Sequence, residues 1–249
     1  MLSKTRLYGF DYAINPYIGC THNCAYCYAR FMCKYVNKRW GTFCIPKSTK
    51  NLKQELKLHE PGSILLSTVT DPYQETEAEK EVTREILEIL RKFEYNVTIL
   101  TKSPLVLRDV DVIKQLNAEV GVTIALTEEH ARRFERNAPS IDERINALKK
   151  LKQEGVKTYV FIGPVVPFIT DANRIVKLVH KYVDYILVDK LRIKHGNWQE
   201  IKPILKKHYS DYYQAISTVL FGKTDYYERI RSEVYTLCKH LKKHVWFCF

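Results

Sequence analysis

The chain has 249 residues, of which 45% are hydrophobic, with only 9 glycines and 9 prolines. This composition excludes collagen-like, low-complexity and disulfide-scaffold proteins, and the length is ample for a buried core. No run of about 18 apolar residues occurs, and no apolar segment follows the N-terminal residues. We therefore expect a soluble, cytoplasmic protein with no membrane partner.

The charge balance is basic: 40 Lys and Arg stand against 28 Asp and Glu, a formal net charge of +12. Such a field attracts phosphate-rich partners, and it favours a nucleic-acid substrate or ligand. The basic residues are spread along most of the chain without a long block, so solvated helix faces explain them equally well. Charge alone therefore does not identify the partner.

Short apolar runs rich in β-branched residues alternate with longer stretches of helical periodicity, which is typical of repeated βα units around a parallel sheet. Six strands are predicted, at residues 8–14, 63–69, 96–101, 120–126, 157–162 and 185–189.

The stretches between these strands predict amphipathic helices. Residues 77–93 carry apolar side chains at helical spacing, and residues 140–153 open with Ser140 and Glu143 in the arrangement of a capping box. Towards the end of the chain, residues 227–241 form another apolar stripe, and residues 245–249 predict a closing strand or a docked tail.

Six βα units fall short of the eight in a closed barrel. The predicted fold class is therefore α/β, a partial (β/α)6 TIM-type barrel with a C-terminal helical extension. We expect one domain over residues 1–249, with a barrel core at about 8–195 and C-terminal helices at about 196–249. A partial barrel leaves a wide mouth at the C-terminal strand ends, so the residues that follow each strand are the candidate site.

The strongest chemical signal follows the first predicted strand, where Cys20, Cys24 and Cys27 fall within eight residues. Seven cysteines in all is an odd number, which disfavours a disulfide framework and favours metal or redox chemistry in a reducing compartment. Three thiolates on one loop can bind a 4Fe-4S cluster, which normally takes four. The remaining iron is then open to an outside ligand, as a catalytic zinc site keeps one position open.

This spacing, with the aromatic residue Tyr26 immediately before the last cysteine, resembles the signature of the radical S-adenosylmethionine (SAM) superfamily. The resemblance implies that Cys20, Cys24 and Cys27 hold the cluster, while the amino and carboxylate groups of SAM bind its fourth iron. It also implies that an electron from an external donor cleaves SAM into methionine and a 5′-deoxyadenosyl radical, which abstracts hydrogen from a substrate.

The wider motif resembles the spore photoproduct lyase-related subgroup over residues 12–171. The matching segments are residues 19–30, 70–74, 101–103 and 138–139. Two positions depart from the subgroup's pattern, because Glu75 and Arg136 stand where proline is usual. Both lie on expected substrate-side loops, so the resemblance implies a reaction class and not a particular substrate.

Four residues near the strand ends complete the cofactor site that the resemblance implies, together with Tyr26. Thr70 and Asp71 are expected near the amino group of SAM, although Asp71 before Pro72 also fits a turn or helix cap. Lys102 is expected to pair with the SAM carboxylate, although a solvated lysine fits as well. Thr123 resembles a ribose-contacting position, although threonine is also simply a good strand residue.

Further polar residues and cysteines carry weaker signals. Glu135 and Arg144 are candidates for the barrel mouth, but charged residues on helices are expected in solvent. The four other cysteines predict either a second metal site, a hydrogen-atom donor or plain buried side chains; they are Cys33, Cys44, Cys238 and Cys248.

Two alternatives belong to other functional classes. In the first, the chain is a non-catalytic nucleic-acid-binding protein in which the cysteines and His22 hold structural zinc, although structural zinc usually uses two separated ligand pairs. In the second, the protein passes electrons onward through additional clusters.

Overall fold

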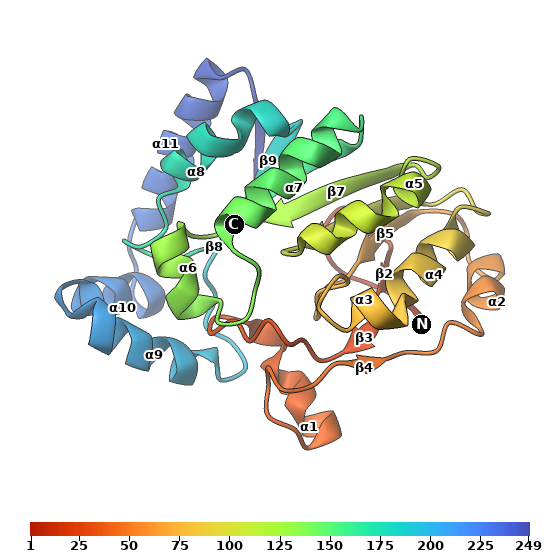
Figure 1. Ribbon diagram of the computed structural model, residues 1–249. Coiled ribbons are helices and arrows are strands. Elements are labelled where there is room, and N and C mark those ends of the chain that lie inside the picture. Colours follow the sequence, from red (N-terminus) through yellow and green to blue (C-terminus); the bar gives the residue numbers. More distant parts are fainter.

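The structure is a computed structural model of residues 1–249, built around an eight-stranded curved sheet (Figure 1). The strand order is β1-β2-β5-β6-β7-β8-β9-β10, in which β1 is antiparallel to β2 and every other pair is parallel. The strands are β1 (Leu2–Lys4), β2 (Tyr12–Ile14), β5 (Ser63–Leu66), β6 (Asn96–Thr101), β7 (Ala118–Thr123), β8 (Lys157–Val165), β9 (Tyr185–Lys190) and β10 (His244–Phe247). A separate antiparallel pair joins β3 (Tyr17–Ile18) to β4 (Ile45–Pro46).

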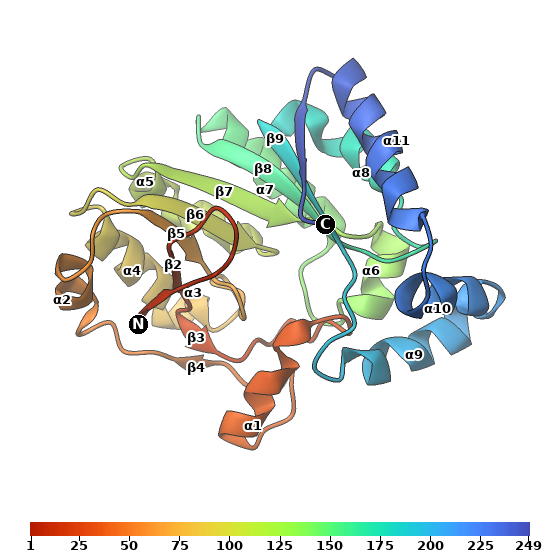
Figure 2. The same ribbon diagram turned by 180° about the vertical axis from the view of Figure 1, so that it is seen from behind.

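Helices cover one face of this sheet, as the two opposite views show (Figures 1 and 2). The α-helices are α1 (Cys33–Val36), α2 (Leu52–Lys57), α3 (Glu77–Lys80), α4 (Val82–Leu90), α5 (Val110–Ile113), α6 (Glu128–Phe134), α7 (Ile141–Gln153), α8 (Ala172–Val179), α9 (Asn197–His208), α10 (Tyr213–Phe221) and α11 (Tyr226–His240). Short 3₁₀ helices occupy Tyr28–Met32, Pro104–Asp109, His180–Tyr182 and Ser210–Tyr212. No helix is both long and apolar enough to cross a membrane.

The core lies between the sheet and these helices. Successive side chains of a strand point to opposite faces, and on the covered face the strands present aliphatic side chains that are 1% exposed or less: Ile64, Leu66, Val97, Ile99, Val120, Val122, Val160, Ile162, Ile186 and Val188. This arrangement confirms the predicted α/β partial barrel. The C-terminal strand ends of β2 and β5 to β9 meet at one mouth.

The predicted strand boundaries needed correction at several ends. The strand expected at 8–14 begins only at Tyr12, because Gly9 has a positive φ of 85° and Tyr8 is fully exposed. The strand expected at 63–69 ends at Leu66, because Ser67 adopts a φ of 74°. The other differences are small: β7 begins and ends a few residues earlier than expected, while β8 and β9 extend further.

The single helix expected at 77–93 is broken at Glu81, whose φ of 50° is left-handed. The break is stabilised by the side chain of Glu77, which lies at the start of α3. Its carboxylate accepts hydrogen bonds from the backbone N–H groups of Thr83 (2.9 Å) and Arg84 (3.3 Å). It therefore satisfies donors at the start of α4 that a continuous helix would have paired internally.

Two other local predictions are confirmed. Ser140 Oγ accepts from Glu143 N (3.3 Å), while Glu143 Oε2 accepts from Ser140 N (2.8 Å), which completes the capping box of α7. The last residues form β10, a strand parallel to β9. The segment from α9 onward packs on the main core through buried side chains such as Ile201, Leu205 and Val234.

Candidate functional site

The three clustered cysteines lie on a loop that follows β3, which we call the cysteine loop (residues 19–27). All three thiols are free, Cys20 and Cys24 are buried, and Cys27 is half-buried. Burial raises the pKa of Cys24 to about 12. Burial also raises the pKa of Cys20, and the nearby Asp71 and the two other cysteines raise it further. Without a positively charged ligand, these buried thiols therefore stay protonated.

A first set of contacts holds the start of this loop and comes from the turn after β5. Gln74 is fully buried, and its Oε1 accepts from Thr21 N (2.9 Å) while its Nε2 donates to Thr70 Oγ1 (2.9 Å). The Thr70 hydroxyl in turn donates to the carbonyl of Gly19. Gly19 itself has a φ of 91°, and a Cβ there would clash with the Phe43 ring at 2.3 Å. The position requires glycine for both reasons.

A second set comes from the segment that follows α6, which runs antiparallel to the cysteine loop. Cys24 and Glu135 form an isolated β-bridge there. Three hydrogen bonds add to it: Ala25 N to Phe134 O (2.7 Å), Asn137 N to His22 O (3.1 Å) and Asn137 Nδ2 to Thr21 O (3.0 Å). The backbone polar groups in the middle of the loop therefore have protein partners.

A third set comes from the C-terminal extension. Asn197, at the first position of α9, is fully buried and donates to the carbonyl of Tyr26 (3.0 Å). Arg30 donates to the carbonyl of Cys24 (3.3 Å) and pairs with Glu200 of α9 (3.4 Å). The extension thus helps to shape the loop that carries the cysteines.

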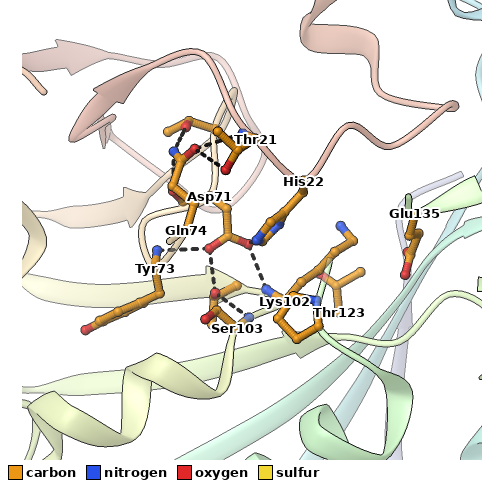
Figure 3. A network of polar contacts seen from close by, with 12 residues as sticks. Thr21, His22, Asp71, Tyr73, Gln74, Lys102, Ser103, Thr123 and Glu135 are labelled. Carbon is orange, nitrogen blue, oxygen red and sulfur yellow. Dashed lines mark hydrogen bonds and ion pairs between the residues drawn. The ribbon is translucent and has the colours of Figure 1, made fainter. Parts of the chain in front are cut away.

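Asp71 lies at the centre of a polar network at the ends of β5 and β6 (Figure 3). Its carboxylate accepts hydrogen bonds from Thr101 Oγ1 (2.6 Å), Lys102 N (2.8 Å) and Tyr73 N (2.9 Å), and His22 Nδ1 lies 3.5 Å from its Oδ2. The bond to Tyr73 N closes the turn that the sequence allowed as an alternative. Most of the acceptor capacity of Asp71 is therefore used within the protein.

Glu135 and Arg144 form a buried ion pair, with Arg144 Nη2 2.6 Å from Glu135 Oε2. Their expected exposure to solvent was wrong, because both are almost completely buried. The phenol of Tyr26 donates to Glu135, and Arg144 also donates to the carbonyls of Pro139 (2.9 Å) and Thr123 (3.2 Å). The carboxylate gains both an opposite charge and hydrogen-bond donors, which makes its burial tolerable.

The ammonium of Lys102, at this mouth, has no carboxylate or carbonyl partner. Its Nζ lies 5.8 Å from the centre of the Tyr26 ring. Burial on its own lowers the pKa of Lys102, but the neighbouring Cys24 and Glu135 outweigh this effect, and the pKa is raised. Lys102 therefore stays protonated and available to an anion.

The structure brings most of the predicted site residues together. Lys102 follows β6 and Thr123 is the last residue of the neighbouring β7, since Thr101 pairs with Val122 in the sheet, and the Thr123 hydroxyl makes no hydrogen bond within the protein. Tyr26 lies between Lys102 and Glu135. Thr70 and Asp71 differ, because their side chains are engaged in holding the cysteine loop and the Lys102 backbone.

These residues fit an iron-sulfur cluster better than a single zinc ion. A cubic cluster binds each thiolate to a different iron, so its ligands need not converge on one point. No three His, Cys, Asp or Glu side chains converge as the ligands of one metal ion would. His22 moreover turns its Nδ1 towards Asp71.

The remaining cysteines lie on separate elements. Cys33 packs with Cys20 and Cys27 in a small apolar cluster, and Cys44 lies beside β4. Cys238 is fully buried on α11, as expected of a small hydrophobic side chain, whereas Cys248 is exposed near the C-terminus.

Sequence reasoning missed the residues that hold the cysteine loop in place. Gln74 lay within a quoted motif but received no role, and Asn137 and Asn197 received none at all. A buried amide has no local signature, because the groups it bonds are up to 171 residues away. Only the adjacent Ala138-Pro139 pair marked the segment of Asn137 in advance.

Comparisons with known proteins agree with this geometry. The Radical SAM superfamily profile matches residues 14–179. An uncharacterized protein of Methanocaldococcus jannaschii is 38% identical over 220 residues, which cover 87% of this chain and 83% of that protein. An uncharacterized protein of Mycobacterium tuberculosis is 29% identical over 177 residues, and the matched part is 66% of this chain and about half (52%) of that protein.

Among solved structures, the fold matches spore photoproduct lyase. A mutant of that enzyme with bound AdoMet and dinucleoside spore photoproduct superimposes with a TM-score of 0.74 at 14% identity, covering 99% of this chain and 79% of that chain. The predicted resemblance is thereby confirmed at the level of the fold.

Proposed function

Because the chain belongs to the radical SAM superfamily, we propose that Cys20, Cys24 and Cys27 hold a 4Fe-4S cluster whose open iron takes SAM. With both groups bound, the chemistry supplied is one-electron cleavage of the SAM sulfonium, which yields methionine and a 5′-deoxyadenosyl radical that takes a hydrogen atom from the substrate. Membership makes the chain an enzyme of this class, and such enzymes need an electron donor.

The protein's own residues would bind and orient the cofactor. The free ammonium of Lys102 pairs with the SAM carboxylate, and the unengaged hydroxyl of Thr123 faces the ribose. Asp71 would act indirectly, by positioning its neighbours. Its carboxylate accepts hydrogen bonds from the Lys102 backbone N–H and the Thr101 hydroxyl. Thr70 and Gln74 likewise hold the carbonyl and N–H groups that flank Cys20.

The observation that carries this proposal is that the cysteine thiols lie next to an unpaired lysine. Three unpaired thiols, two buried and one half-buried, are held on one loop by contacts from three other segments, and they lie beside a protonated lysine without an ion-pair partner. The thiols require a positively charged metal group to ionise, and the lysine requires an anion. A SAM-binding cluster supplies both.

Anaerobic reconstitution with iron and sulfide, followed by metal counting and an assay for 5′-deoxyadenosine with SAM and dithionite, tests the proposal. We expect about four iron atoms per chain and deoxyadenosine formation. Cys24→Ala should abolish cofactor cleavage but leave the fold, while the matched variant Cys248→Ala, at an exposed cysteine, should keep both. Stoichiometric zinc without iron, or cleavage retained in Cys24→Ala, would refute the assignment.

The substrate class we propose is nucleic acid or a nucleotide-derived lesion. The net charge of +12 favours a polyanion, and the matching lyase was solved with a dinucleoside photoproduct. Binding of the reconstituted protein to DNA and RNA oligonucleotides at rising salt tests this point. A steep fall of affinity with salt supports it, and no binding at low salt contradicts it.

A further inference from the structure

The segment that carries the cysteines is also strongly basic. Between Asp11 and Glu55 no acidic residue occurs, whereas seven Lys and Arg do, which is more than half of the net charge of +12. Four of the seven closely follow the cysteine loop in the chain, on and around α1: Arg30, Lys34, Lys38 and Arg39. These cations therefore belong to a segment other than the strand ends at the barrel mouth.

Helix α1 and the residues after it project from the body of the protein, beyond the cysteine loop and away from the sheet (Figures 1 and 2). Lys34, Lys38 and Arg39 are exposed there, and none of them forms an ion pair. Tyr35 beside them is 76% exposed. We call these four residues the α1 face.

The inner side of the same segment packs directly against the cysteines. Cys33, Val36 and the buried Trp40 belong to the small apolar cluster that contains Cys20 and is in contact with Cys27. Apolar side chains of the α1 segment therefore pack directly against the cluster that contains Cys20. An electron carrier at this surface would therefore sit on the segment that packs against the cysteine loop.

The cofactor site of the proposed function lies on the opposite side of the cysteine loop. Lys102 and Thr123 lie at the strand ends, on the side of the loop that faces the sheet. SAM and substrate are expected on that side, where the barrel mouth lies. The α1 face can therefore be occupied by a protein while the mouth remains free.

We propose that the α1 face is the docking surface for an acidic one-electron carrier protein, a flavodoxin or ferredoxin, that reduces the cluster. The inference rests on the cluster of the proposed function. Transfer oxidises the carrier by one electron and reduces the cluster by one, so no further co-reactant is needed. A small surface with free cations suits this role, because electron-transfer encounters bury little area and depend on charge for steering.

The test measures the rate at which photoreduced flavodoxin, or reduced ferredoxin, bleaches the absorbance of the reconstituted protein under anaerobic conditions. The variant Lys34→Glu/Lys38→Glu/Arg39→Glu should slow reduction by both carriers about tenfold or more at low ionic strength. Added salt should slow the wild type towards the variant's rate. The charge-neutral variant Lys34→Gln/Lys38→Gln/Arg39→Gln should slow it less, in the same direction.

Two controls separate docking from damage. The variant Lys149→Glu/Lys177→Glu/Lys239→Glu changes the net charge equally on exposed lysines of α7, α8 and α11, and it should be reduced at the wild-type rate. Reduced methyl viologen, a small cation that needs no docking surface, should reduce all variants equally. These readouts do not depend on SAM cleavage.

Equal rates for the wild type and the α1-face variant with both carriers would overturn the inference. So would normal reduction combined with a loss of oligonucleotide binding in that variant, which would assign the surface to nucleic acid. A wild-type protein that takes up no iron would instead refute the proposed function, on which this inference depends.

Discussion

The helix-covered face of the sheet and the mouth at its C-terminal end are lined by opposite kinds of side chain. Towards the covering helices the strands present Ile, Val and Leu in an almost fully buried layer. At the mouth, beneath the cysteine loop, the buried side chains are charged or amide-bearing, among them Asp71, Gln74, Glu135 and Arg144.

The difference teaches how stability and function are divided in this protein. Aliphatic packing stabilises without specifying a partner, since it depends mainly on buried area and fit. The polar mouth is costly to bury and is stable only when each group has its partner, so it fixes the position of the cysteine loop. Mutations should therefore act differently on the two faces.

The largest effect is expected at the mouth, where Glu135→Ala would leave Arg144 as a buried, unpaired charge. We expect the free energy of unfolding of the apoprotein to fall by about 3–5 kcal/mol in urea titrations. The double variant Glu135→Leu/Arg144→Met should lose less than the single one, because no charge is left uncompensated. A larger loss in the double variant would show that the pair is not coupled in this way.

On the covered face, Leu66→Ala removes an aliphatic side chain with no exposed surface. We expect a loss of about 3 kcal/mol in the free energy of unfolding, from lost burial and the cavity left behind. The affinity of the folded, reconstituted protein for SAM should not change. A change in that affinity would mean that the two faces are not as independent as their composition indicates.

At the mouth, the variant Lys102→Met tests the proposed contact with SAM. It removes the free ammonium without creating an unpaired charge. In the proposed function this costs a charge-assisted hydrogen bond, about 1.5–3 kcal/mol, or roughly tenfold to a hundredfold in the Kd for SAM. Calorimetric titration of the reconstituted protein measures it, with Lys149→Met on α7 as the exposed control. Unchanged affinity would exclude Lys102 from the cofactor site.

The smallest effect is expected at the helix cap of α7, where Ser140→Ala should cost about 1 kcal/mol of stability. The hydrogen bonds from Ser140 lower the pKa of Glu143 below its ordinary 4.5, so this part of the stabilisation is present above pH 4.5 and is lost as the pH falls through the lowered value. The difference between wild type and variant should therefore shrink in acid. A difference that grows below pH 4.5 would contradict the assigned geometry.

Local sequence patterns determined a large part of the architecture. The β-branched runs marked β5 to β9, and Ser140 with Glu143 marked the start of α7. The cysteine spacing marked the loop and led to the correct superfamily. These features depend on residues close together in the chain, so periodicity and spacing reveal them.

Only the tertiary structure decided which polar residues belong to the mouth. Glu135 and Arg144 look like solvent-facing residues in sequence, but the phenol that Glu135 binds lies on Tyr26, 109 residues away. Asn197 and Gln74 reach the cysteine loop across 171 and 53 residues. A polar side chain is stable in the interior only where backbone groups or charges from distant parts of the chain pair with it. The local sequence pattern does not show which distant groups these are.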